Sequence, residues 1–223
     1  MDRLRAVART RTYADPCGIA RALDLVGERW ALLVVRELVL GPKRFTDLRA
    51  GLPRLSPDVL SQRLRDLEAA GVLARRRLAP PAGSRVYELT RRGRDLEPIL
   101  LALGAWGSTA PMPAGANELG ADSTILGLRT LFDPELAEGV EARIELRLGE
   151  HVFSAGVGDR RLTIERGPAA GPDAALAAAP GVLAAILWHD RTLTDAERSD
   201  GAEVEGGREV LERFLRLFPL PQS

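Results

Sequence analysis

Polar side chains at helical spacing are the residues of this chain best suited to recognition chemistry. Leucines recur on one face of the segment from Ser56 to Ala70, which predicts a helix packed on a core. The opposite face presents Asp58, Ser61, Gln62 and Arg65. Glutamine pairs with adenine and arginine with guanine in the major groove of DNA. The pattern predicts a helix that specifies bases, with an ordinary solvated helix face as the alternative.

A segment rich in arginine follows that helix. Two stretches with β character, from Val72 to Leu78 and from Ser84 to Leu89, are separated by prolines and a glycine, which predicts a hairpin. No acidic residue is interleaved among the first three arginines, which favours contact with DNA phosphates. Charges that protect an edge strand from aggregation are the alternative. The arginines concerned are Arg75, Arg76, Arg77 and Arg85.

The elements that must position these residues follow from apolar periodicity and from glycine and proline stops. Ser56 is a good N-cap, and Pro57 suits the first helical position. Arg44 and Ser56, at the starts of two of the helices, complete the candidate DNA contacts. The predicted helices cover residues 19–26, 30–38, 45–52, 57–70 and 91–106. The order is that of a helix-turn-helix followed by a basic wing.

The second half of the chain predicts an α+β domain. The stretch from Glu141 to Leu148 alternates strictly between apolar and charged residues, as a half-buried strand does. A short turn at Gly149-Glu150 connects this strand to the next one, at 151–157. A third strand, at 161–166, follows after Gly158-Asp159. The predicted strands are 141–148, 151–157, 161–166, 173–179 and 202–205, and the predicted helices are 124–132, 180–188, 194–198 and 208–218. The fold class is therefore α+β, with a winged helix-turn-helix domain at 1–107, a linker at 108–120 and a second domain at 121–223.

The charge distribution supports this division. The 223 residues carry no formal net charge, but residues 1–107 hold 20 Lys and Arg against 12 Asp and Glu, while residues 108–223 hold 11 against 19. A basic half of net charge +8 and an acidic half of net charge −8 suggest domains with different partners. Only the basic half is suited to a polyanion.

Several other classes of protein are disfavoured. One cysteine excludes an intrachain disulfide, and two histidines far from it give no zinc site, so no metal or other cofactor is expected. No secretory signal or apolar membrane span is present, which predicts a cytoplasmic location. An enzyme is not expected, because His189 and Asp190 are adjacent on a helix and point about 100° apart.

The segment from Cys17 to Trp106 resembles the HxlR-type winged helix-turn-helix regulators. The resemblance implies a dimeric bacterial transcription factor on a palindromic site in double-stranded DNA. It also implies dimer contacts through the helix at 19–26 and the helix at 96–106. The residues that carry it are Cys17, ALDLVGERW (22–30), RELVLGPKRFTDLR (36–49), LSPDVLSQRLRDLEAAG (55–71) and YELTRRGRDL (87–96).

Cys17 matches a position at which some members of that family sense oxidants, quinones or aldehydes. Gly18 stands where a proline usually follows in the family. Arg21, one turn away, could help to lower the thiol pKa. The alternative is a small buried residue, since free cysteine packs as a modest hydrophobe.

The second half, from about Ile125 to Pro219, resembles a sterol-carrier-protein-type domain. The strands at 141–148, 151–157 and 161–167, the stretch at 173–187, the VEGG turn at 204–207 and the closing FLRLFPLP carry this likeness. It implies a layered α+β fold around an apolar cavity for a lipid or another hydrophobic molecule. An ordinary hydrophobic core is the alternative for each candidate. The candidate lining residues are Phe132, Phe153, Leu187, Trp188, Phe214 and Phe218.

Three functional hypotheses follow. The first is a dimeric DNA-binding regulator whose C-terminal domain binds a hydrophobic effector. The second is a lipid-binding or lipid-carrying protein in which the winged helix serves as a dimerisation scaffold. The third makes Cys17 the switch of a regulator that responds to oxidants or electrophiles, with the C-terminal domain as a structural brace.

Overall fold

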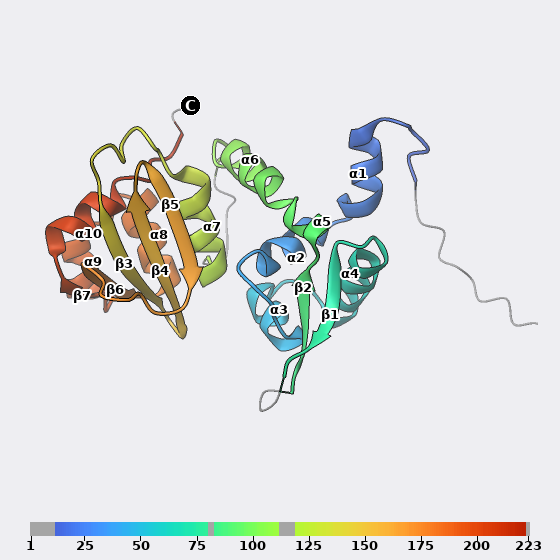
Figure 1. The fold of residues 1–223 in the computed structure, drawn as a ribbon, viewed down its shortest axis with the longest axis horizontal. Helices are drawn as coiled ribbons and strands as arrows, with labels where there is room; N and C mark the ends of the chain where they lie inside the picture. The colour runs from blue at the N-terminus through green and yellow to red at the C-terminus, as the bar shows by residue number, and fades with distance from the viewer. Residues whose placement is uncertain (1–11, 80–82, 112–118, 222–223) are drawn as a thin grey trace, which may run out of the picture.

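The computed structural model describes residues 12–79, 83–111 and 119–221 of the chain. Buried side chains form two separate hydrophobic cores, one in each half of the sequence. The helices and strands of the two halves form two separate groups in Figure 1. The first extends from Val26 to Leu89, and the second from Ala121 to Phe218. Each half of the sequence therefore has a core of its own.

The first half is a winged helix-turn-helix. Ser56 caps the fourth helix, where its hydroxyl accepts a hydrogen bond from the Val59 amide at 3.4 Å. Leu60, Leu64 and Leu67 on the inner face of that helix are fully buried. The elements are α1 (Gly18–Val26), α2 (Ala31–Leu38), α3 (Phe45–Gly51), α4 (Pro57–Ala69) and the antiparallel strands β1 (Leu73–Arg77) and β2 (Arg85–Leu89). The predicted helices and hairpin are confirmed within one or two residues at each end.

The single helix predicted over residues 91–106 is wrong. The chain forms a short helix α5 (Arg91–Arg94), which Thr90 caps, and then a separate helix α6 (Glu97–Gly107). Pro98 explains the interruption, because it has no amide hydrogen to donate to the Arg94 carbonyl and its ring crowds that carbonyl. The start of a helix is the position at which proline is tolerated.

The second half is a five-stranded sheet with helices packed against it. The strand order is β5-β4-β3-β6-β7, and β3 and β6 are parallel whereas the other neighbours are antiparallel. Helices α7 and α10 pack against the sheet (Figure 1). The elements are α7 (Ala121–Leu131), β3 (Ala142–Leu148), β4 (His151–Gly158), β5 (Arg161–Arg166), β6 (Ala174–Ala178), α8 (Pro180–Trp188), α9 (Leu193–Ser199), β7 (Glu203–Gly206) and α10 (Arg208–Leu215).

One turn and two helix ends in this half differ from the prediction. The turn between β4 and β5 is Asp159-Arg160, not Gly158-Asp159, and both residues have positive φ, of 49° and 59°, as a type I′ hairpin turn requires. Helix α7 begins at Ala121, before the predicted start, and α10 ends at Leu215, before the predicted end. The predicted strand at 173–179 is confirmed as β6, and it lies inside the sheet, between β3 and β7.

The two halves are packed against each other. Helix α7 lies against α2 and α6, and Leu40 of the first half packs against the core of the second. Arg129 of α7 forms an ion pair with Glu97 of α6 at 2.6 Å. The predicted linker at 108–120 lies largely outside the described residues, at 112–118. The acidic half is thus a direct neighbour of the basic half.

Candidate nucleic-acid interface

The outer face of α4 carries the candidate base-reading residues. Asp58, Gln62 and Arg65 are exposed there, and Ser61 is half-buried. Arg65 Nη2 donates to Gln62 Oε1 at 2.6 Å, and Gln62 Nε2 donates to Asp66 Oδ1 at 2.6 Å. An exposed hydrogen bond contributes only about 0.5–1.5 kcal/mol net, so base edges can replace these partners at small cost.

Arg44 and Ser56 lie at the N-termini of the two helices of the helix-turn-helix. Both residues are exposed. The Arg44 amide donates to Asp47 Oδ2 at 2.9 Å, which fixes the start of α3. The oxygen of the Ser56 hydroxyl accepts the Val59 amide, but its proton remains available for donation. Both positions suit phosphate contacts, because exposed amides and polar side chains at helix N-termini attract anions.

The arginines of the hairpin have acidic neighbours that the linear sequence does not reveal. Arg75 forms an ion pair with Glu68 of α4 at 3.0 Å, and Arg76 pairs with Glu88 of β2 at 2.9 Å. The absence of interleaved acidic residues in β1 therefore does not mean that these arginines are unpaired. Both pairs are exposed to solvent and contribute at most about 1 kcal/mol each, so a phosphate can compete for the guanidinium groups.

Arg77 and Arg85 face each other across the hairpin. They are directly opposite in the antiparallel register, and both are exposed. Like charges directly opposite destabilise a strand pair. Arg77 Nε donates to the Gly83 carbonyl at 3.1 Å, a neutral acceptor that does not cancel the repulsion. An anion such as a DNA phosphate would relieve it.

Cys17 is exposed, at the N-cap position of α1, so the alternative of a small buried residue is wrong. The backbone amides of Ile19 and Ala20 lower the pKa of the Cys17 thiol, because they stabilise the thiolate. The residue is thus accessible and has a lowered pKa, and both properties favour reactivity of a cysteine.

The six candidate cavity residues do not surround one cavity. Phe153, Phe214 and Phe218 are fully buried. The Phe214 and Phe218 rings pack edge to face, with centroids 5.1 Å apart. One shallow groove contains Phe132, beside α6 and β5, and a separate one contains Leu187 and Phe218, beside α9 and α10. The interior that the resemblance implies to be hollow is filled by side chains in this conformation.

Trp188 has a packing role. Its indole Nε1 donates to the Phe218 carbonyl at 3.2 Å. Its ring lies so close to Gly127 of α7 that a Cβ there would come within 2.5 Å of the indole. Glycine is therefore required at that position for the ring to pack against the helix.

Sequence reasoning missed a group of buried charged residues between the two halves. Glu37 and Asp122 are almost fully buried, and Lys43 joins them. One signal was available, since Glu37 lies three residues from Val34 and therefore on the apolar side of its helix. A second signal was that Lys43 is the only lysine.

Other kinds of site receive no support from the described residues. Within residues 12–79, 83–111 and 119–221, histidine, cysteine and acidic side chains do not gather in a group that could hold a metal ion. Across the same ranges, no helix has the length and apolar character needed to cross a membrane.

A helix-turn-helix with an exposed polar recognition helix and an arginine-bearing hairpin defines a winged helix protein of the DNA-binding class. The model of the family described as HxlR-like helix-turn-helix matches residues 25–114. The chain belongs to this family. The match ends before the five-stranded sheet, so it identifies only the first half.

The similarity to individual relatives also covers less than half of this chain. A regulator from Synechocystis sp., named as an uncharacterized HTH-type transcriptional regulator, is 39% identical over 109 residues, which cover 45% of this chain and 80% of the relative. A similarly named Bacillus subtilis protein, YvaP, is 41% identical over 87 residues, or 39% of this chain and 80% of the relative. The solved structure of the redox regulator HypR in its oxidized form is 33% identical and covers 44% of this chain and 100% of that chain, with a TM-score of 0.39.

Proposed function

We propose that the protein is a homodimeric transcriptional regulator that binds a palindromic DNA site through α4 and the β1–β2 hairpin. The observation that carries the proposal is the exposed Gln62–Arg65 face of α4, with an arginine-bearing hairpin beside it. The Glu68–Arg75 ion pair joins these two elements directly. Family membership supports the same function, because the curated relatives are named as HTH-type transcriptional regulators.

A second copy of the chain is the expected partner of an apolar surface on α1 and α6. Helix α6 has two stripes. Glu97 and Gly104 face α7, where Glu97 pairs with Arg129 and a Cβ on Gly104 would contact Thr130. The opposite stripe leaves apolar side chains in solvent, and α1 exposes two more. A groove of about 620 Å³ lies between the two helices and is lined by Leu25 of α1 and Ile99 of α6, among others. The exposed apolar residues are Ile99, Leu103 and Trp106 of α6 with Ile19 and Leu23 of α1.

Two arguments favour a second copy of the chain as the partner that covers the apolar residues of α1 and α6. Large apolar side chains that are exposed on two helices favour a protein interface. A two-fold dimer would also place two α4 helices on the two half-sites of a palindrome.

The experiment that tests the function measures binding to DNA next to the gene of this protein, at several salt concentrations. A site-specific regulator should bind one segment more tightly than unrelated DNA of equal length. Its affinity should fall with salt, with a slope of about −0.9 per phosphate contact on a logarithmic scale. Equal affinity for all sequences at low salt would contradict the proposal.

The second half is proposed to bind a hydrophobic effector and to have a sterol-carrier-like fold. The α+β sheet and the apolar residues around Phe132 support this idea, and the filled interior requires the core to open. Native mass spectrometry of the purified full chain would reveal a co-purified ligand. Lipid transfer between vesicles, without any preferred DNA site, would favour the carrier hypothesis instead.

The exposure and the lowered pKa of Cys17 favour a second candidate, control of DNA binding by an oxidant or electrophile. Because its pKa is lowered, Cys17 should react with iodoacetamide at neutral pH faster than free cysteine does, and more slowly as the pH falls through that pKa. A quinone should then change the DNA affinity of the wild type. Cys17→Ser should remove that response, and a Cys17→Ser variant that still responds would exclude the candidate.

A further inference from the structure

We propose that Asp122 and Lys43 are positioning residues through which the C-terminal half holds the DNA-binding elements in their binding conformation. The inference rests on the proposed DNA-binding function and deepens it. The residues concerned are Glu37, Lys43, Asp122 and Arg166, here called the Lys43 cluster.

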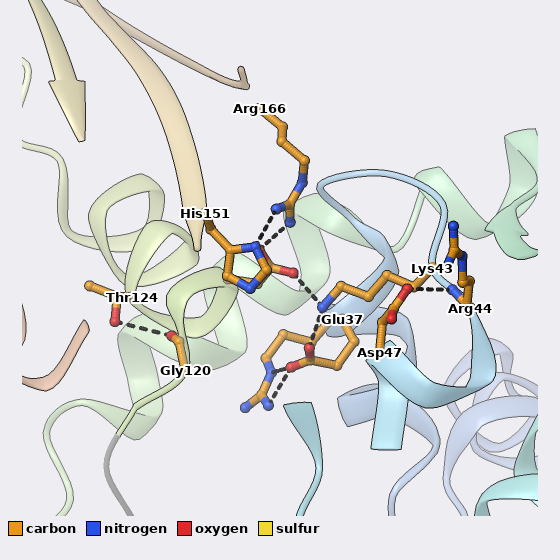
Figure 2. Close-up of polar contacts among 10 residues, drawn as sticks. Glu37, Lys43, Arg44, Asp47, Gly120, Thr124, His151 and Arg166 are labelled. Atoms are coloured by element: carbon orange, nitrogen blue, oxygen red, sulfur yellow. Dashed lines mark hydrogen bonds and ion pairs between the residues drawn. The ribbon is translucent and has the colours of Figure 1, made fainter. Parts of the chain in front are cut away.

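The cluster is a row of alternating charges that crosses the boundary between the halves. Lys43 Nζ lies 2.6 Å from Glu37 Oε2 and also forms an ion pair with Asp122 of α7. Asp122 in turn pairs with Arg166 at the end of β5. Figure 2 shows Lys43 extending toward Glu37, with Arg166 and His151 on the side of the C-terminal half.

Burial increases the effect that the loss of one of these charges has on the structure. The side chains of Glu37, Asp122 and Lys43 are only 3%, 5% and 14% exposed. An exposed ion pair contributes little, but removing one member of a buried pair leaves the other charge with less compensation. Glu37 would keep Arg36, at 2.8 Å, and Asp122 would keep Arg166. Lys43 serves two buried carboxylates, one from each half. Loss of Asp122 should therefore shift Lys43 and disturb its contact with Glu37.

The backbone of Lys43 connects the cluster to the hairpin. The Lys43 amide donates to the Tyr87 carbonyl at 3.0 Å, and the Tyr87 amide donates to the Lys43 carbonyl at 2.8 Å. Tyr87 belongs to β2, the strand that also carries Arg85. A movement of Lys43 would thus be transmitted directly to the arginine-bearing hairpin.

Helix α3 meets the cluster at both of its ends. Arg44, which follows Lys43, is the N-cap of α3. At the other end, a Cβ on Gly51 would lie 2.2 Å from Glu37 Oε2, so the helix approaches the buried carboxylate as closely as glycine allows. The cluster therefore sets the position of the first helix of the helix-turn-helix as well as that of the hairpin.

The choice of lysine agrees with this role. Lys43 is the only lysine, and the chain otherwise uses arginine as its long basic residue. An ammonium group is a compact point charge with three donors, whereas a guanidinium group is planar and broader. The compact group suits a buried position between two carboxylates that approach it from different elements.

The test compares full-length wild type with Asp122→Asn, using the preferred DNA segment as the probe. Asp122→Asn removes a negative charge, so net charge alone predicts equal or tighter DNA binding. The proposal predicts the opposite sign, a loss of affinity of about tenfold, typical of coupling between sites. Lys43→Gln changes the net charge in the other direction and should also weaken binding about tenfold.

Asp200→Asn is the matched control. Asp200 pairs with Arg191 within the C-terminal half, at 2.7 Å, and removing its charge reports the effect of net charge alone. Hydrogen exchange supplies a readout that does not depend on DNA. The amides of Lys43 and Tyr87 should exchange faster in Asp122→Asn and in Lys43→Gln than in wild type and in Asp200→Asn.

The outcomes separate this inference from the proposed function. A wild type without any preferred DNA segment would overturn the proposed function, while the exchange data would still report on the cluster. A wild type that binds, with Asp122→Asn equal to Asp200→Asn in affinity and exchange, would overturn the inference alone. If Asp122→Asn does not fold, as judged by circular dichroism, the exchange of the Tyr87 amide in Lys43→Gln decides, because net charge alone also predicts weaker DNA binding for that variant.

Discussion

Leu103→Asp should convert the protein from a dimer to a monomer and abolish tight DNA binding. Leu103 lies in the middle of the exposed apolar stripe of α6, between Ile99 and Trp106. A charge in a desolvated interface costs several kcal/mol, which corresponds to roughly a hundredfold or greater loss of dimer affinity. A monomer contacts one half-site only, so affinity for the full palindrome should fall with it.

Analytical ultracentrifugation measures the first effect, and titration of the preferred DNA segment measures the second. Leu136→Asp is the matched control, because Leu136 is similarly exposed, at 50% against 46%, but lies in the C-terminal half, beyond α7. The control should remain dimeric. If Leu103→Asp also remains dimeric, the α1–α6 surface is not the interface between copies.

Arg65→Ala should weaken binding to the preferred site by about 1–3 kcal/mol, or roughly five- to 150-fold, and should relax the preference for one base. The side chain is exposed on α4, where it donates a hydrogen bond to Gln62. A guanidinium group that contacts two acceptors of one guanine discriminates against the other bases. Its removal should therefore affect the preferred site more than unrelated DNA.

Arg76→Ala separates base reading from phosphate contact. Arg76 lies on β1 and pairs with Glu88 at the surface. Its loss should weaken binding to all sequences alike and reduce the salt slope by about 1. Binding measurements on the preferred segment and on a scrambled segment distinguish the two variants. Equal losses on both segments for Arg65→Ala would rule out a role in base recognition.

The local elements could be predicted because their signals are local. The leucines of α4 recur at helical spacing, and Ser56 with Pro57 marks its start. The strict alternation of apolar and charged residues predicted strand β3, and the Gly149-Glu150 turn predicted that β3 pairs with β4. Pro98 was the one local signal that was overlooked, and it divides the helix after the hairpin.

The candidate site was predictable only in part. Exposure of Gln62 and Arg65 follows from their position opposite the buried leucines of α4. The partners of the hairpin arginines did not follow, because Glu68 reaches Arg75 from another element and Glu88 reaches Arg76 from the opposite strand. Periodicity predicts which side of an element is exposed, and it contains no information about what lies across from it.

The sequence by itself determined that this chain has a winged helix with a polar recognition face, because helix periodicity, capping and turn chemistry depend on neighbouring residues. Only the tertiary structure decided three other features. It placed β6 inside the sheet, parallel to β3, and it filled the interior expected to be a cavity. It also brought Asp122 to Lys43, across the boundary between two halves of opposite charge. Such contacts join residues far apart in the chain, and the packing of whole elements decides which of them meet.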